Sequence, residues 1–238
     1  MIRDLVGWFA TTEGIGRSVV DHLVLSFTPV MAAALLTLPV GLYIGHRRRF
    51  ELLAVGLANL GRAVPTFGIL ALVLPLSIRF GWGLGFWPTF VALFFLALPP
   101  ILTNTYVGVR DVEPEIVESG RGMGLTELQI VRRIESPLAL PLILAGLRVA
   151  ALQSIATATI ASLVAGPGLG QYIFLGFRAR DNGSLLGGAI LVAVLAVLTE
   201  AAFGLLTKLA DRGPSPSEWG TPGAASEPAQ IGRLDAVV

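Results

Sequence analysis

The sequence contains no cysteine, and charged residues are scarce for a chain of 238 amino acids. Without thiols it cannot form disulfides, thiolate zinc sites, iron–sulfur clusters or cysteine nucleophiles. Only 14% of the residues are charged whereas 54% are hydrophobic, which is atypical of a water-soluble domain. The net charge is +1 and the 17 basic residues are scattered along the chain, so no face for binding nucleic acid is expected. Composition therefore predicts a membrane protein.

Motifs for catalysis and nucleotide binding are missing as well. The sequence has no Gly-x-x-x-x-Gly-Lys-Ser/Thr loop, so any ATP that drives it must be bound elsewhere. His22 and His46 lie at opposite ends of the first long apolar stretch, too far apart to share a metal, and both are expected at the membrane interface. No nucleophile and base occur in a recognisable arrangement. We therefore predict neither an enzyme nor a bound cofactor or metal.

Long apolar stretches are what the sequence has instead. A helix needs about 20 apolar residues to cross about 30 Å of hydrocarbon. Residues 23–45, 52–78 and 80–109 meet this requirement. Residues 136–177 are apolar but too long for one crossing, and residues 182–207 form a further apolar stretch. The predicted fold class is an all-α polytopic bundle of about five transmembrane helices.

Three charged residues interrupt these stretches. Arg62 and Arg148 are each expected to extend toward the headgroups, with a structural ion pair or a pathway role as the alternative. Glu200 lies more than one helical turn inside from Lys208, so we expect it to have a partner within the bundle.

The positive charges near the span ends predict the orientation. Cytoplasmic loops retain Lys and Arg, so the amino terminus is expected outside and the carboxyl terminus in the cytoplasm. The predicted domains are an extracytoplasmic segment over residues 1–20, which could form an interfacial helix, a transmembrane domain over 21–210, and a disordered cytoplasmic tail over 211–238.

The charged segment between the third and fourth spans, residues 110–137, is predicted to form two short helices outside the membrane. Pro114 suits the first turn of one helix, and Gly124 suits a left-handed position at its end. Thr126 and Gln129 have the spacing of a capping box at the start of the second helix, and Pro137 is expected to end that helix.

The second short helix carries an apolar stripe. Leu128, Val131 and Ile134 recur at a spacing of three residues, beside Arg132 and Arg133. The stripe could pack on the ends of the chain's own spans or enter a groove on a partner protein. The residues of this segment alone leave both alternatives open.

The spacing of this segment resembles the cytoplasmic loop signature of bacterial binding-protein-dependent ABC importer permeases. The matching positions are Glu118-Ser119-Gly120, Gly124 after three residues, and Ile134-Glu135-Ser136-Pro137 after nine more. Ser119 and Gly120 stand where the family has two alanines, and Ser136 stands where it has a leucine. Residues 98–106, 140–148 and 166–170 further resemble the permeases for glycine betaine, carnitine and choline.

The resemblance implies a coupling helix that seats in a cleft of a separate ATP-binding subunit. It also implies a bacterial cytoplasmic membrane location, two ABC ATPase subunits, a second permease subunit that is identical or related, and an extracytoplasmic solute-binding protein. Nucleic acid is not among these partners. The residues that it assigns to the ATPase-coupling loop are Glu118, Ser119, Gly120, Gly124, Thr126, Glu127, Leu128, Val131, Arg132, Ile134 and Pro137.

Two further groups of residues are candidates for the path of the solute. Gly166, Gly168 and Gly170 would help to form the outer gate or the surface that meets the binding protein, or simply a turn. Small polar side chains would line the pathway or join helices. These candidates are Asn104, Gln153, Thr157 and Thr159.

The predicted function is the permease subunit of an ATP-driven importer of a compatible solute such as glycine betaine, choline, carnitine or proline betaine. An amino-acid or methionine importer permease is the alternative, because the loop signature is shared. A secondary transporter that works alone is the alternative from a different class.

Overall fold

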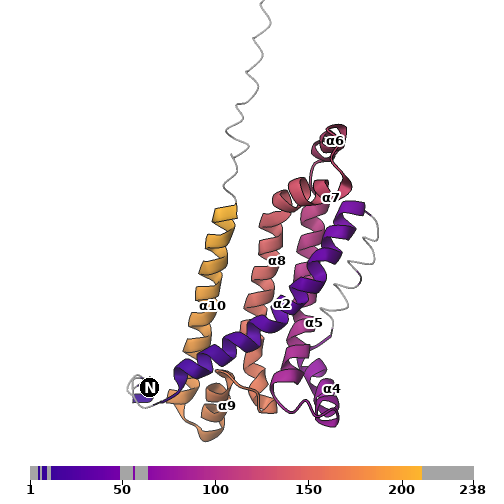
Figure 1. The fold of residues 1–238 in the computed structure, drawn as a ribbon. Helices are drawn as coiled ribbons and strands as arrows, with labels where there is room; N and C mark the ends of the chain where they lie inside the picture. Colours follow the sequence, from indigo (N-terminus) through magenta and orange to yellow (C-terminus); the bar gives the residue numbers. More distant parts are fainter. Residues whose placement is uncertain (1–4, 6, 10–11, 49–55, 57–63, 211–238) are drawn as a thin grey trace, which may run out of the picture.

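The computed structural model describes residues 5, 7–9, 12–48, 56 and 64–210, and the regular structure in these ranges is helical. Four long helices run along the bundle: α2 (Ile15–Arg47), α5 (Phe86–Arg110), α8 (Ser136–Thr157) and α10 (Asn182–Ala210). The shorter α4 (Thr66–Arg79) packs on α5. Short helices lie at its ends: α6 (Pro114–Gly122) and α7 (Glu127–Ile130) at one, α9 (Gly170–Ala179) at the other (Figure 1).

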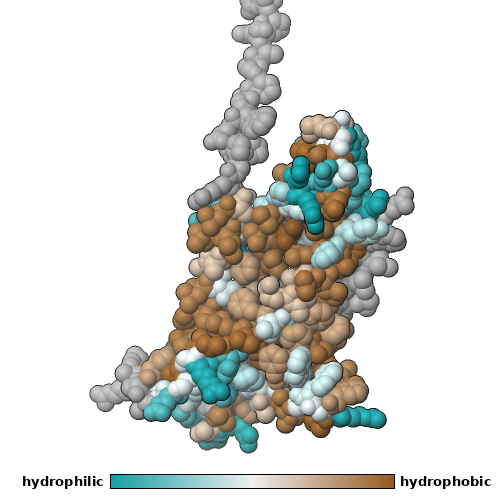
Figure 2. All heavy atoms as spheres, in the orientation of Figure 1, coloured by the Kyte–Doolittle hydropathy of each residue, from teal (hydrophilic) through white to brown (hydrophobic). Residues whose placement is uncertain are grey.

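Within the described residues, four helices are long and apolar enough to cross a membrane, and α4 is a shorter apolar helix. The predicted all-helical polytopic fold class is confirmed. In Figure 2 the middle of the visible face is apolar, and hydrophilic residues gather toward the two ends. Lipid tails have no polar groups to solvate charges, so this distribution fits a bundle that spans the bilayer.

Several predicted boundaries differ from the observed ones. Helix α5, which corresponds to the third predicted span, begins at Phe86 rather than at residue 80, because Gly81, Gly83 and Gly85 have positive φ angles of 73, 79 and 83°. The predicted span 52–78 coincides with α4 over its second half. Residues 49–55 and 57–63, which include Arg62, and the predicted tail 211–238 lie outside the described residues.

The apolar stretch 136–177 does break, as its length predicts. After α8 the chain tightens into the 3-10 helix η2 (Ala158–Val164) and leaves it at Ala165, whose φ is 59°. It then folds into α9 before α10 returns along the bundle (Figure 1).

The core forms where α2 packs against α5 and α8. Ala33 and Ala97 are fully buried in this core. Gly45 lets α2 and α5 approach closely. A Cβ atom at Gly45 would lie 2.6 Å from the Cβ of Val109, so nothing larger than glycine fits there. Small residues at helix contacts give the close packing that stabilises helices in lipid.

Two charged residues that interrupt the apolar stretches pair with each other. Arg148 on α8 donates from Nε to Oε2 of Glu200 on α10 at 2.6 Å, and a second guanidinium nitrogen also contacts the carboxylate. Of the alternatives for Arg148, the structure therefore shows the structural ion pair, because α10 places a carboxylate beside it. The expected partner of Glu200 is confirmed.

His22 is fully buried rather than interfacial. Helix α2 begins at Ile15, within the predicted N-terminal segment 1–20, so His22 lies two turns inside the bundle. Its Nε2 donates to the carbonyl oxygen of Ile155 at 3.0 Å. Trp8, from the same N-terminal segment, is buried against Gly187 of α10.

Candidate functional site: the α6–α7 end of the bundle

The turn after α6 has the geometry that its residues predict. Gly124 has a φ of 82° and donates from its N–H to the carbonyl of Arg121 at 2.9 Å. The N–H of Leu125 donates to the carbonyl of Gly120 at 3.2 Å. These two bonds form a Schellman motif, which satisfies the last carbonyls of the helix. The left-handed position predicted for Gly124 is confirmed.

The predicted capping box at α7 is also present. The N–H of Gln129 donates to Oγ1 of Thr126 at 3.4 Å, and the N–H of Thr126 donates to Oε1 of Gln129 at 2.8 Å. A helix of four residues cannot form alone because nucleation costs more than its few hydrogen bonds return. The cap, the packing described below and the continuation into the next helical turn therefore hold α7.

Pro137 does not end the second helix, contrary to the sequence-based expectation. Helix α7 continues through a π-helical turn, η1 (Val131–Glu135), directly into α8. In that turn the N–H of Ser136 donates to the carbonyl of Val131, five residues back. The wider turn accommodates a proline that has no N–H for the carbonyl of Arg133. The predicted helix from Thr126 to Ile134 is thus the first part of a bent continuous helix.

The apolar stripe faces two ways. Ile130, absent from the predicted stripe, is fully buried with Val112 and Val117 at the base of the segment. Ile134 packs on this cluster, whereas Leu128 is 61% exposed. The structure therefore covers one side of the helix itself and leaves Leu128 uncovered.

The small residues of the loop signature separate into two roles. Gly120 is buried, and a Cβ there would lie 2.6 Å from Cδ1 of Ile134, so α6 and η1 meet at this glycine. Ser119 is exposed and donates its hydroxyl proton to the carbonyl of Glu115. The requirement for a small side chain thus applies to Gly120.

An exposed surface with apolar and basic character results at the tip of the segment, and we call it the docking tip. Its apolar members come from α6, the turn and α7, and its basic members come from η1. Glu118 of the loop signature is also exposed beside it. The docking tip consists of Ile116, Met123, Leu128, Arg132 and Arg133.

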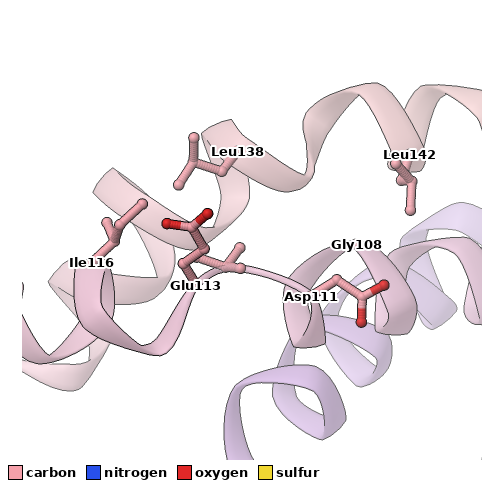
Figure 3. Close-up of a pocket in the computed structure, with 7 residues that line it drawn as sticks. Gly108, Asp111, Glu113, Ile116, Leu138 and Leu142 are labelled. Carbon is pink, nitrogen blue, oxygen red and sulfur yellow. The ribbon is translucent and has the colours of Figure 1, made fainter. Parts of the chain in front are cut away.

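A cavity of about 330 Å³ lies behind the docking tip, between the end of α5, the start of α6 and the start of α8 (Figure 3). Asp111 and Glu113 supply carboxylates to its wall, and Leu138 and Leu142 supply an apolar side from α8. Because Gly108 lacks a side chain, α5 and α8 come close here.

Charged contacts fasten the segment together. Arg121 on α6 donates from Nε and from a terminal nitrogen to the two carboxylate oxygens of Glu127 on α7, at 3.1 and 3.2 Å. This hydrogen-bonded carboxylate raises the pKa of Arg121 above its ordinary value. The pair is exposed, so it orients the two helices more than it stabilises them.

His46, at the last turn of α2, belongs to this cluster. Its Nδ1 lies 2.8 Å from Oε2 of Glu135 and its Nε2 lies 2.9 Å from Oε2 of Glu127. The His46 and Glu135 side chains are only 7% and 5% exposed. No local pattern predicts these contacts, because 81 and 89 residues separate His46 from its two partners along the chain.

The glycine loop at the other end is packed inside the molecule. Gly166, Gly168 and Gly170 are all buried. A Cβ at Gly170 would lie 2.1 Å from the Thr159 carbonyl oxygen, and one at Gly168 would lie 3.0 Å from Nδ1 of His22. These glycines are therefore positions of close backbone approach rather than exposed contact surface.

The four candidate pathway residues have different surroundings. Asn104 donates from Nδ2 to the carbonyl of Pro100 at 2.8 Å, and it lies against Gly146, as a residue that joins two helices would. Thr159 donates to the Ala156 carbonyl.

The other two pathway candidates are Thr157 and Gln153, both on α8. Thr157 is half-buried at the end of α8. Gln153 lines a cavity of about 460 Å³ together with Thr66, Pro99 and Pro100. Among the four candidates, all of which the structure describes, Gln153 alone lines this cavity.

Asp181 caps α10 at the same end as α9. Its Oδ1 accepts from the N–H of Gly183 at 2.9 Å and its Oδ2 from the Ser184 hydroxyl at 2.5 Å. These bonds, chiefly that from Ser184, hold the pKa of Asp181 below its ordinary value. The cap therefore stabilises the fold above the unfolded-state pKa, about pH 4, and this stabilisation is lost as the pH falls through the lower folded-state pKa.

We expect Asp181→Ala to lower the melting temperature of the detergent-solubilised protein slightly at neutral pH, because the first amides of α10 lose their acceptor. The difference between variant and parent should shrink in acid as the parent loses the same contribution. Ser184→Ala, which removes the main cause of the lowered pKa, should give a smaller decrease. An equal decrease at all pH values would contradict the role of the ionised cap.

Residues 37–212 match the family described as "Binding-protein-dependent transport system inner membrane component". The chain is 37% identical over 180 residues to the choline transport system permease protein OpuBB of Bacillus subtilis, covering 76% of this chain and 81% of that protein. It is 38% identical over 186 residues to the carnitine transport permease protein OpuCB of Listeria monocytogenes, covering 78% and 83%.

A solved structure has the same fold. An inward-facing form of the MetNI methionine ABC transporter superposes with a TM-score of 0.75, covering 85% of this chain and all of that one. The two sequences are 22% identical, so the likeness concerns the fold alone.

Proposed function

The chain belongs to the family of binding-protein-dependent transport system inner membrane components, and we propose that it is the permease subunit of an ATP-driven importer of osmoprotectant solutes. It is a multi-pass permease component of the inner membrane, and ATP hydrolysis belongs to a separate subunit. The observation that carries the proposal is the similarity to permeases named for choline, carnitine and glycine betaine over three quarters of the chain.

The proposed solutes share one chemical feature. Choline, carnitine, glycine betaine and proline betaine all carry a quaternary ammonium group, and we propose that the solute is one of them. Methionine and other amino acids are the alternative solutes. The similarity to the methionine transporter concerns the fold alone, so it does not support this alternative. Gln153, in the cavity beside Pro99 and Pro100, is the pathway residue that this geometry favours.

We propose that the docking tip seats in a cleft of the ATPase subunit on the cytoplasmic side. The exposed Leu128 and Met123, together with the two exposed arginines of η1, suit a partner groove with an apolar floor and acidic rim. This places α9 and the amino terminus outside, in agreement with the larger number of basic residues at the α6–α7 end. A solute-binding protein would then meet the α9 end, and a second permease subunit would complete the pathway.

The continuous helix from α7 to α8 supplies the mechanical connection. A displacement of the docking tip moves α8 directly, because η1 joins the two helices without a loop. Closure of the ATPase pair would thereby tilt α8, and with it α5 and α2, which pack against it. Coupling of this kind transmits a rigid-body movement between two packed arrangements.

Reconstitution tests the proposal. The permease with its ATPase and solute-binding protein in vesicles should take up labelled glycine betaine, choline or carnitine when ATP is supplied, with methionine and histidine as control solutes. Uptake that continues without the ATPase would point instead to a transporter that works alone. Uptake of methionine in preference to the quaternary ammonium solutes would support the amino-acid alternative.

A further inference from the structure

The connection between the docking tip and α8 contains a structural weakness. The π-helical turn Val131–Glu135 has a shifted hydrogen-bond pattern, and α7 beyond it is only four residues long. π turns are rare, and they often mark functional sites and positions where a helix bends. If the turn flexed, a push on α7 would bend the elbow instead of moving α8.

One side chain from another helix spans this elbow. His46 contacts Glu127, at the start of α7, through Nε2 at 2.9 Å. It contacts Glu135, the last residue of the π turn, through Nδ1 at 2.8 Å. The imidazole therefore links the two sides of the bend to each other and to the end of α2.

The surroundings of His46 make the link firm on one side. The His46 and Glu135 side chains are almost completely buried, and hydrogen bonds are strongest where water cannot compete for them. Gly45 packs directly on Val109 of α5, which fixes the backbone from which His46 extends. Arg121 also donates to Glu127, so side chains from α2 and α6 converge on one carboxylate of α7.

We propose that His46 braces the π elbow between α7 and α8 and fastens α2 to it. It is a positioning residue for coupling, since it lies beneath the docking tip and not on it. This inference rests on the proposed function for the direction in which force travels. The geometry of the brace does not depend on the solute or on the ATPase.

A distance measurement tests the brace without transport. The chain has no cysteine, so cysteines introduced at the exposed positions Leu128 on α7 and Leu138 on α8 would carry the only spin labels. In the purified permease in nanodiscs, His46→Ala should broaden the distance distribution between the labels. Arg47→Gln, which changes a neighbouring exposed residue of α2, should leave it narrow. An unchanged distribution in His46→Ala would overturn the proposal.

The ratio of imported solute to hydrolysed ATP tests what the brace does for coupling. In the reconstituted complex, His46→Ala should lower the number of solute molecules imported per ATP about tenfold, within the usual range of coupling between sites, while the ATPase still co-purifies. His46→Gln should fall between the parent and His46→Ala, because an amide can replace one of the two contacts.

A double variant separates bracing from simple destabilisation. Removing His46 leaves the buried Glu135 carboxylate without this partner, which could by itself disturb the fold. His46→Ala with Glu135→Gln removes that charge but does not restore the link. The brace is supported if the double variant still imports few solute molecules per ATP and still shows a broad distance distribution between the two labels. Recovery of coupling there would overturn it, whereas absence of transport in the parent complex would count against the proposed function alone.

Discussion

Arg148→Glu is expected to prevent α10 from packing stably against α8. The substitution places two carboxylates together within the apolar length of the bundle, where a charge without a partner costs about 3 kcal/mol. Folded protein recovered in detergent should fall several-fold, and protease sites in α10 should become accessible. The same reasoning predicts that Glu200→Arg is equally damaging on its own.

The size of this effect follows from how little else holds α10. Among the described residues, its buried positions are Gly183, Gly187, Gly188 and Thr199, and three of these lie near its first turns. The ion pair is therefore its main polar attachment to α8 beyond the α9 end. The swapped variant Arg148→Glu with Glu200→Arg should recover most of the yield, because the pair is restored with its charges reversed.

Lys208→Glu serves as the matched control. It reverses an exposed charge near the end of the same helix, and it should leave the yield close to that of the parent. If Arg148→Glu folded as well as this control, or if the swap gave no recovery, the ion pair would not be the attachment described here.

Gly124→Val is expected to uncouple the permease from its ATPase. The φ of Gly124 is 82°, and a left-handed backbone costs about 1–2 kcal/mol for an ordinary residue and more for a β-branched one. A rearranged turn breaks the Schellman bonds that set α7 against α6. ATP hydrolysis that the solute-binding protein stimulates in the reconstituted complex should fall at least about tenfold, within the range that coupled sites show.

Gly122→Val controls for side-chain bulk. Neither glycine has another atom within 4 Å of an added Cβ, so both sites have open space, but only Gly124 has a positive φ. Gly122→Val should therefore retain most of the stimulation. Equal losses in both variants would show that bulk at the docking tip, and not the backbone conformation, is what matters.

The local features of the docking segment were predictable from sequence because the residues that make them are neighbours. Thr126 and Gln129 form their capping box within one turn, and Gly124 takes the conformation that glycine favours at a helix end. The consequence of Pro137 was not predictable in the same way. Its missing N–H allowed either an end to the helix or a wider turn, and the packing of Ile130 and Glu135 selects the turn.

The contacts that join distant parts of the chain could not be read from spacing. His46 and His22 both belong to α2, and each meets partners more than 80 residues away. For Arg148 and Glu200, apolar surroundings indicated that each needs a partner, but the identity of the partner depends on which helices lie side by side. The spacing of Leu128, Val131 and Ile134 likewise did not indicate that Ile130 would be buried in the core.

Site-directed cross-linking at Leu128 tests the central claim most directly, namely that the docking tip contacts the ATPase. A single cysteine at Leu128 should cross-link to the ATPase subunit in the assembled complex, and one at Phe177, equally apolar and exposed on α9, should not. Cross-linking of the ATPase from Phe177 and none from Leu128 would contradict the account.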